Sequence, residues 1–263
     1  MQNLLPSILS YLGVYRIYES ILSRNVKKFP MPKHIAIILD GNRRWANNKS
    51  IKRVIGHIEG ANTAEELLEW CHEIGIKTIT LYLLSTENLD RSPEELDELF
   101  ELFTERLNKL LSDERIVRFR VRVKAIGRLE LVSKRMQEIL KEIEAKTADY
   151  SDHFLNIAIA YGGRTEIIDS VKKISTLVKE GRISPEQINQ KTIEESLYTS
   201  YLPNPDPDLV IRTSGEERLS GFLLWQSAYS ELVFVDEYWP DFRKIDLMRA
   251  VRTFQKRSRR FGR

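Results

Sequence analysis

Residues 34–46 read HIAIILDGNRRWA, an unbroken apolar run that ends in a charged, amide-rich turn. Such a run is typical of a strand buried on both faces, as in a parallel sheet covered by helices. Outward from it, short β-branched runs alternate with longer segments of helical period. The six runs are 34–39, 78–83, 119–126, 154–160, 208–211 and 232–234. The pattern predicts an α/β fold: a single domain with a mostly parallel six-stranded sheet flanked by helices.

Local signals mark an edge strand and two helix ends. Over 118–125, arginine or lysine alternates with apolar residues, so this strand should be half exposed and near an edge. Gly75 should end a helix whose apolar face runs over 61–74. Ser92 as N-cap, Pro93 at the first helical position and Glu95 completing a capping box should begin the next helix.

Composition excludes several classes of protein. Of 263 residues, 42% are hydrophobic and 30% are charged, which excludes a disordered or collagen-like chain. The net charge of +3 is too small to indicate nucleic acid, and we expect no such partner. A single cysteine, Cys71, excludes an intrachain disulfide and a thiolate-rich metal site, which favours a reducing, cytoplasmic location.

The N-terminal segment 1–29 is predicted to form an amphipathic helix, followed by one globular domain over 30–263. Its uncharged run, 1–15, is too short to cross a bilayer, and no basic segment precedes it as a signal peptide requires. Two interpretations stay open: a helix packed on the domain, or a helix in contact with a membrane surface.

Ligands of open parallel sheets bind at the carboxyl ends of the strands, and the first strand end carries Asp40. An aspartate leaving a buried strand is a natural magnesium ligand, although it could instead be a helix N-cap. Gly41 and Asn42 open a helix whose backbone donors would face an anion. Further on, Arg44, Arg53 and His57 add cationic donors.

Two other strand ends are equally polar. One carries Ser85, Thr86, Glu87, Asn88 and then Arg91, which could serve as ligands or only as turn residues. The other, from Arg212 through Arg218 to Ser220, has enough donors to enclose a phosphate or diphosphate. A carboxylate for a divalent cation with arginines from three strand ends indicates a site for two polyphosphate groups. Group transfer with diphosphate as leaving group is the predicted chemistry.

Long motifs in the same order resemble the cis-prenyltransferase family, the undecaprenyl diphosphate synthase-like proteins. They are HIAIILDGNRRWA (34–46), GH (56–57), TLYLLSTEN (80–88), LNIAIAYGGR (155–164), DLVIRTSGEERLSGFLLWQSAYSELVF (208–234) and WPDF (239–242). The resemblance covers nearly the whole domain. It implies a Mg²⁺-dependent homodimeric enzyme with an apolar substrate tunnel, which transfers a prenyl group from an allylic diphosphate to isopentenyl diphosphate and forms cis double bonds.

The resemblance also implies residue roles. Asp40 and Glu231 would bind Mg²⁺, and Asp40 and Asn88 would be catalytic. The allylic diphosphate would be held by Gly41, Asn42, Arg43, Arg44, Arg53 and His57, with Ser85, Thr86, Glu87 and Arg91 completing that wall. Isopentenyl diphosphate would be held by Arg212, Arg218 and Ser220. Trp45 and Leu219 stand inside the matching motifs, Leu89 directly follows one, and all three are expected to contact substrate, while Arg260 and Gly262 would reach a partner's diphosphate.

Two positions depart from the family pattern. Arg43 stands where many bacterial members have glycine, and Leu89 where they have tryptophan, which leaves the allylic substrate open. Residues 161–164 also match, but we interpret them as a structural strand-to-helix turn. Alternative functions are a non-standard acceptor or a short product, a non-catalytic partner subunit, and a phosphohydrolase that uses Asp40 as nucleophile.

Overall fold

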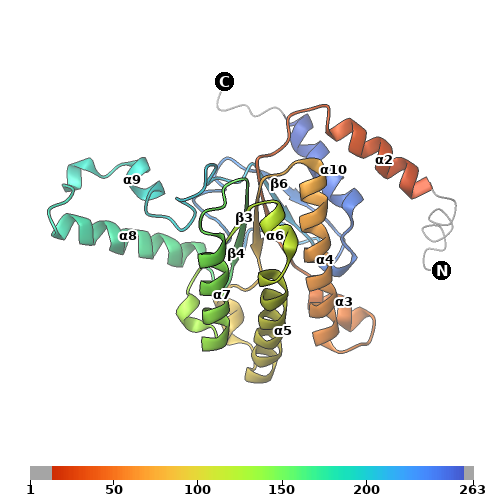
Figure 1. Cartoon of the computed structure of the whole chain (residues 1–263), viewed down its shortest axis with the longest axis horizontal. Coiled ribbons are helices and arrows are strands. Elements are labelled where there is room, and N and C mark those ends of the chain that lie inside the picture. Colours follow the sequence, from red (N-terminus) through yellow and green to blue (C-terminus); the bar gives the residue numbers. More distant parts are fainter. Residues whose placement is uncertain (1–13, 258–263) are drawn as a thin grey trace.

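The computed structural model describes residues 14–257 and contains one six-stranded sheet (Figure 1). The strands are β1 His34–Ile38, β2 Thr78–Tyr82, β3 Val121–Ile126, β4 His153–Ala158, β5 Leu209–Arg212 and β6 Glu231–Phe234. Their order is β3-β4-β2-β1-β5-β6, and every neighbouring pair is parallel. The predicted α/β class and single six-stranded sheet are therefore confirmed, and the sheet is parallel throughout.

Helices fill the connections between the strands. The α-helices are α2 Val14–Val26, α3 Asn42–Asn48, α4 Arg53–Ile74, α5 Pro93–Leu111, α6 Glu114–Arg118, α7 Lys134–Thr147, α8 Gly163–Lys179, α9 Gln190–Glu194 and α10 Lys244–Lys256. The 3₁₀ turns are η1 Thr86–Asp90, η2 Leu129–Leu131, η3 Pro185–Gln187 and η4 Trp239–Asp241. In Figure 1, α4, α5 and α7 lie along one side of the sheet, whereas α8 and α9 extend away from the body.

The central strand β1 is buried on both faces, as its apolar run predicted. Ile35 and Ile37 enter the larger core beneath α4 and α5, while Ala36 and Ile38 enter a smaller cluster with Tyr82 on the other face. This alternation follows from the two-residue period of a strand. Because both faces are covered, β1 is held rigidly, and the residues that follow it leave the sheet in a fixed direction.

Most local predictions hold, with two corrections. β3 lies at the sheet edge as predicted, but Phe119 and Arg120 belong to the turn after α6, where Arg120 has a φ of 47°. Gly75 ends α4 in the left-handed region with a φ of 85°. The Ser92 hydroxyl accepts from the backbone N–H of Glu95 at 3.4 Å. Glu95 does not complete the capping box, because its carboxylate accepts from Arg91 instead.

Helix α2 packs against α10 near the chain end. Leu22 and Val26 are each 1% exposed, and Gln255 Nε2 donates to the Val26 carbonyl at 2.8 Å. The opposite side of the helix exposes Ile17 and Ile21. No helix among residues 14–257 is long and apolar enough to span a membrane.

Gly60 gives a test of the close packing among α4, α3 and η4. A Cβ at Gly60 would collide with the Asn42 side chain and lie 2.9 Å from Trp239 Cδ1. We expect Gly60→Ala to lower the free energy of unfolding by roughly 1–3 kcal/mol through overpacking, as measured by urea denaturation. Gly75→Ala is the control, since no atom lies within 4 Å of its Cβ and only backbone strain is added, about 1 kcal/mol. A Gly60→Ala protein as stable as wild type would contradict the packing described.

Candidate active site

The polar strand ends meet beside β1 and β5, where the chain changes direction across the sheet. From β1 the chain continues to β2 on one side, whereas from β5 it continues to β6 on the other. Neighbouring strands with diverging connections form the crevice in which parallel sheets bind ligands. Asp40 follows β1 and Arg212 ends β5, so both lie at this crevice.

Arg212 connects the first and third polar strand ends. Its side chain is 5% exposed, and Nη2 donates to Asp40 Oδ2 at 2.8 Å. Nη1 donates to Ser220 Oγ at 2.8 Å and to the carbonyl of Arg218. Burial raises the pKa of Asp40, but the hydrogen bond and charge of Arg212 and the charge of Arg44 outweigh it and hold this pKa below its usual value. Asp40 is therefore ionised at neutral pH.

Asp40 does not cap the following helix, so the alternative interpretation of this residue is wrong. Helix α3 begins at Asn42 with Gly41 in the N-cap position, and no side chain caps it. Gly41 has a φ of 108°, and a Cβ there would lie 2.7 Å from Tyr238 Cδ1. Only glycine fits this turn. Because Asp40 does not cap the helix, its carboxylate contacts Arg212 and Arg44 instead.

A second group of charges surrounds Arg44. Its Nη1 donates to Glu216 Oε1 at 3.0 Å, its Nη2 donates to Ser214 Oγ at 2.5 Å, and it lies 3.2 Å from Asp40 Oδ1. Glu216 also pairs with Arg218, whose side chain is 62% exposed. Arg44 and Arg218 therefore share one carboxylate, while Arg218 remains open to solvent.

Glu95 belongs to the site, although the sequence analysis interpreted it only as part of a capping box. Its carboxylate is 14% exposed and lies 3.1 Å from Arg91, 3.6 Å from Arg43 and 3.7 Å from Arg53. Three of the predicted anion-binding arginines thus meet at one carboxylate. Low exposure of its side chain distinguishes Glu95, as a carboxylate that binds arginines, from an ordinary capping glutamate, which usually faces solvent. This exposure is known only from the folded chain.

His57 lines the pocket formed between these strand ends, but it is not the cationic donor that was predicted. Burial, and then the charges of Arg91 and Arg43, lower its pKa to about 4, although Glu95 acts in the opposite direction. Its imidazole is therefore neutral at pH 7. Its Nε2 is buried and finds no hydrogen-bond partner among the described residues, so this atom is available to a ligand.

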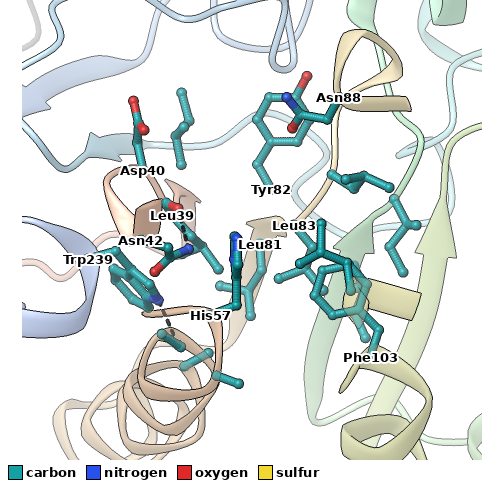
Figure 2. A pocket seen from close by; sticks show the side chains of 18 of the residues that line it. Leu39, Asp40, Asn42, His57, Leu81, Tyr82, Leu83, Asn88, Phe103 and Trp239 are labelled. Carbon is teal, nitrogen blue, oxygen red and sulfur yellow. Dashed lines mark hydrogen bonds between the residues drawn. The ribbon is translucent and has the colours of Figure 1, made fainter. Parts of the chain in front are cut away.

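The second strand end forms the opposite wall. The Ser85 hydroxyl accepts from Asn88 N at 3.2 Å, and Asn88 Oδ1 accepts from Ser85 N at 3.2 Å. The turn interpretation is thus correct for these two side chains, yet both also line the pocket. Figure 2 shows Asp40 and Asn88 on opposite sides of it. The Thr86 hydroxyl donates a hydrogen bond to Glu87 Oε2 at 3.2 Å, and Thr86 does not line the pocket.

The turn at 161–164 is structural, as interpreted. Gly163 N donates to the Gly221 carbonyl at 2.7 Å and begins α8, and a Cβ at Gly163 would lie 2.5 Å from that carbonyl oxygen. Tyr161 is fully buried, and the turn supports the wall beneath Thr86.

A cavity of about 540 Å³ begins at the polar mouth and continues beneath it into an apolar interior. It runs between the sheet and helices α4 and α5, and its walls come mainly from aliphatic and aromatic side chains. Those on the strands are Leu81, Leu155 and Ile157, those directly after strands are Leu83 and Ile159, and those on the helices are Leu68, Leu99, Phe103, Leu107 and Leu110. This shape accommodates a ligand with an anionic head and a long hydrocarbon tail.

Several predicted site residues lie elsewhere. Glu231 begins β6 and pairs through Leu209 with Ile35, at the opposite end of the sheet from Asp40. Five residues of strand separate those levels, roughly 16 Å, and Glu231 pairs with Arg257 at 3.0 Å. The expectation that Glu231 lies beside Asp40 in this chain is therefore wrong, because it overlooked that a parallel strand starts far from the site.

Three apolar predictions also miss the pocket. Trp45 is buried, and Lys49 Nζ lies 3.8 Å from the centroid of its ring. Leu89 packs on the main core, and Leu219 packs on the smaller cluster. None of them lines the cavity. Arg260 and Gly262 lie outside the described residues.

Other pocket residues were not predicted. Trp239 donates from Nε1 to the Gly60 carbonyl at 2.7 Å, and its place in the WPDF motif (239–242) was its sequence signal. Phe103 and Arg106 had only helical periodicity to distinguish them, which does not separate a cavity wall from a packed core.

The site joins a carboxylate, several arginines and an apolar cavity, and so defines a transferase whose substrate carries a diphosphate on a hydrocarbon chain. The family model described as putative undecaprenyl diphosphate synthase matches residues 38–262. Tritrans,polycis-undecaprenyl-diphosphate synthase (geranylgeranyl-diphosphate specific) of Methanopyrus kandleri is 54% identical over 95% of this chain and 92% of its own length. The protein of the same name from Methanocaldococcus jannaschii is 53% identical over 95% of this chain and 89% of its own.

Solved structures agree with these matches. Lavandulyl diphosphate synthase from Lavandula x intermedia, in complex with dimethylallyl diphosphate, has a TM-score of 0.83 at 32% identity and covers 89% of this chain and 99% of its own. A probable undecaprenyl diphosphate synthase from Campylobacter jejuni has a TM-score of 0.72 at 33% identity, covering 89% and 100%.

The chain belongs to the undecaprenyl diphosphate synthase family of cis-prenyltransferases. It is an enzyme that transfers a prenyl group from an allylic diphosphate to isopentenyl diphosphate and releases diphosphate.

The lowered pKa of His57 predicts how stability depends on pH. An unfolded histidine gains a proton below its ordinary pKa of about 6.5, whereas folded His57 gains one only near 4, so stability falls as pH decreases between these values. Between pH 7 and about pH 5, we expect His57→Gln to lose less free energy of unfolding than wild type, by up to about 2 kcal/mol. The His57→Gln protein should still lose some stability as pH falls, because burial also lowers the pKa of His34 to about 4. Identical slopes in urea denaturation would show that His57 is not desolvated.

Proposed function

We propose that the chain extends geranylgeranyl diphosphate with isopentenyl diphosphate by successive cis additions to a product of undecaprenyl length. The support for the substrate is the geranylgeranyl-diphosphate specificity in the names of relatives that are 46–54% identical to this chain. The observation that carries the reaction is the ionised Asp40 between Arg212 and Arg44 at the mouth of a long apolar cavity. The head of each substrate would stay at the mouth while the growing tail enters the cavity.

A magnesium ion fits this donor set. Asp40 offers one ionised carboxylate at the mouth, and no three His, Cys, Asp or Glu side chains among residues 14–257 gather closely enough to form a complete metal site. Mg²⁺ commonly uses one or two carboxylates and completes its shell with water and substrate phosphates. Asp40 would hold it, and the ion would supply charge neutralisation to the departing diphosphate.

The allylic diphosphate would bind at the α3 side of the mouth. Arg43, Arg53 and Arg91 already converge on one anionic group, the Glu95 carboxylate, so a second anion can be held by the same guanidinium groups. Asn42 adds a side-chain amide at the pocket wall, and its Nδ2, which donates to the Leu39 carbonyl at 3.4 Å, is the atom that would donate to the diphosphate. His57, neutral at pH 7, would add a hydrogen bond rather than a charge.

Isopentenyl diphosphate would bind beside the loop after β5. Arg218 is solvent-exposed and Ser220 is fixed by Arg212, so both can meet a diphosphate without disturbing the core. Holding the two diphosphates side by side would orient the alkene toward the allylic carbon and lower the barrier by proximity. Asn88 would lie on the far wall near the reacting atoms, where its neutral amide would position them by hydrogen bonds.

Assembly and membrane contact are also proposed. Helix α8 extends from the body and exposes Ile168 and Val171, three residues apart on one face, which could pack on a second copy in a homodimer (Figure 1).

The exposed Ile17, Ile21 and Phe29 near α2 could contact a membrane surface. Sizing chromatography and vesicle flotation test these two proposals.

The proposed reaction is tested with purified protein, Mg²⁺, labelled isopentenyl diphosphate and a panel of allylic primers. We expect geranylgeranyl diphosphate to give the highest kcat/KM and a long polyprenyl product. A single condensation with a short primer would favour the short-product alternative, and the absence of any condensed product would refute the proposal.

Asp40→Asn separates charge from shape at the mouth. Because the amide is isosteric but binds a cation weakly, we expect kcat to fall roughly a hundredfold or more. The mutant should stay folded by circular dichroism, since Arg212 retains Ser220 and a backbone carbonyl as acceptors. Normal turnover would remove Asp40 from the reaction.

Arg218→Ala tests the isopentenyl diphosphate site at an exposed residue. One charge-assisted contact contributes roughly 1.5 kcal/mol, so we expect the KM for isopentenyl diphosphate to rise about tenfold. The KM for the allylic primer should change little. An effect confined to the primer would mean that the two diphosphate sites are exchanged.

A further inference from the structure

A second cavity of about 290 Å³ lies beyond the apolar end of the active-site cavity. It extends toward α6 and the start of β3. Its apolar walls include Ile76, Ile79, Ile116, Phe119, Val121 and Phe154. The residues common to the walls of both cavities are Glu65, Leu68, Arg106, Leu110 and Leu155. The two cavities therefore adjoin, and these five side chains separate them.

Within that shared wall, Glu65 and Arg106 are the polar exceptions. Arg106 lies on the face of α5 that also carries Phe103 and Leu110, three residues before and four after, so a charged group interrupts an otherwise apolar stripe. Arg106 Nη1 donates to Glu65 Oε1 at 2.9 Å across the gap between α5 and α4. Figure 2 shows Phe103 near Leu83, and both side chains line the active-site cavity.

The ion pair is partly buried and stays charged. The Arg106 side chain is 21% exposed and that of Glu65 31%. Burial raises the pKa of Glu65, but hydrogen bonds from Lys109 and Arg106 outweigh it and keep this pKa below its usual value. Arg106 Nε is buried and has no hydrogen-bond partner among the described residues. A hydrocarbon chain pressed against these groups would remove water from them without offering hydrogen bonds in return, which is unfavourable.

We propose that the Glu65–Arg106 ion pair is the partition that limits product length by closing the active-site cavity against the second cavity. This inference rests on the proposed function, because it requires a polyprenyl tail that grows into the active-site cavity. Elongation stops when the tail meets the pair, and product is released at that length. Removal of the guanidinium group joins the two cavities and admits further isoprene units.

Arg106→Ala is the direct test, and the ion-pair network favours a folded protein. Lys109 Nζ lies 2.5 Å from Glu65 Oε2, so the carboxylate keeps a cationic partner when Arg106 is removed. With the primer that wild type uses best, mass analysis of dephosphorylated products should show chains longer by one or more isoprene units. If Arg106→Ala does not fold, Arg106→Met, which keeps an apolar stem for packing, takes its place with the same expectation.

Two control variants make the test specific. Arg115 lines the second cavity only, and pairs with Asp113 and Glu69, so Arg115→Ala removes an ion-paired arginine without opening the partition. Its products should keep the wild-type length. Val121 also lines only the second cavity and is half-buried at the sheet edge, so Val121→Phe fills that space. We expect Val121→Phe to leave wild-type products unchanged and to restore wild-type length in the Arg106→Ala background.

The outcomes separate this inference from the proposed function. A wild-type protein that rejects geranylgeranyl diphosphate refutes the proposed primer, yet a change in product length with any accepted primer still reports on the partition. An unchanged product length in folded, active Arg106→Ala protein overturns the inference. Equal lengthening in Arg115→Ala, or failure of Val121→Phe to reverse the effect, also overturns it.

Discussion

The contact between the buried guanidinium of Arg212 and the carboxylate of Asp40 is the interaction on which the site depends. It joins the ends of β1 and β5 at the point where the chain connections diverge, and the same guanidinium fixes Ser220 and the carbonyl of Arg218. The charge of this 5% exposed arginine is compensated by the Asp40 carboxylate, which lowers the cost of burying it. Stability and the ionisation of Asp40 therefore have one cause.

The rest of the site follows from a sharp change in polarity at the sheet edge. At the mouth, arginines from α3, α4 and the turn before α5 gather around Glu95, whereas one or two turns deeper the walls are leucine, isoleucine and phenylalanine. This gradient orients an amphiphilic substrate with its diphosphate at the mouth. The Glu65–Arg106 pair returns charge to the wall at the deep end, so the apolar segment is bounded on both sides.

The sequence predicted the sheet well because the signal for a buried strand is local. The apolar run before Asp40 identified β1 within one residue, and alternating arginines identified β3 as an edge strand. Predictions that depended on contacts between distant segments, or on burial, were less accurate. Glu231 was placed beside Asp40, His57 was expected to be charged before its burial was known, and Glu95 was interpreted only as a cap. The wall between the two cavities joins α4, α5 and the sheet, and no single segment reveals it.

A double-mutant cycle between Asp40 and Arg212 tests the central claim most directly. The free energy of unfolding would be measured by urea denaturation at neutral pH for wild type, Asp40→Asn, Arg212→Met and the double variant. Because the two groups form a largely buried, charge-assisted hydrogen bond, we predict a coupling energy of about 1.5–3 kcal/mol. A coupling energy near zero would contradict the claim that this contact organises the strand ends into one site.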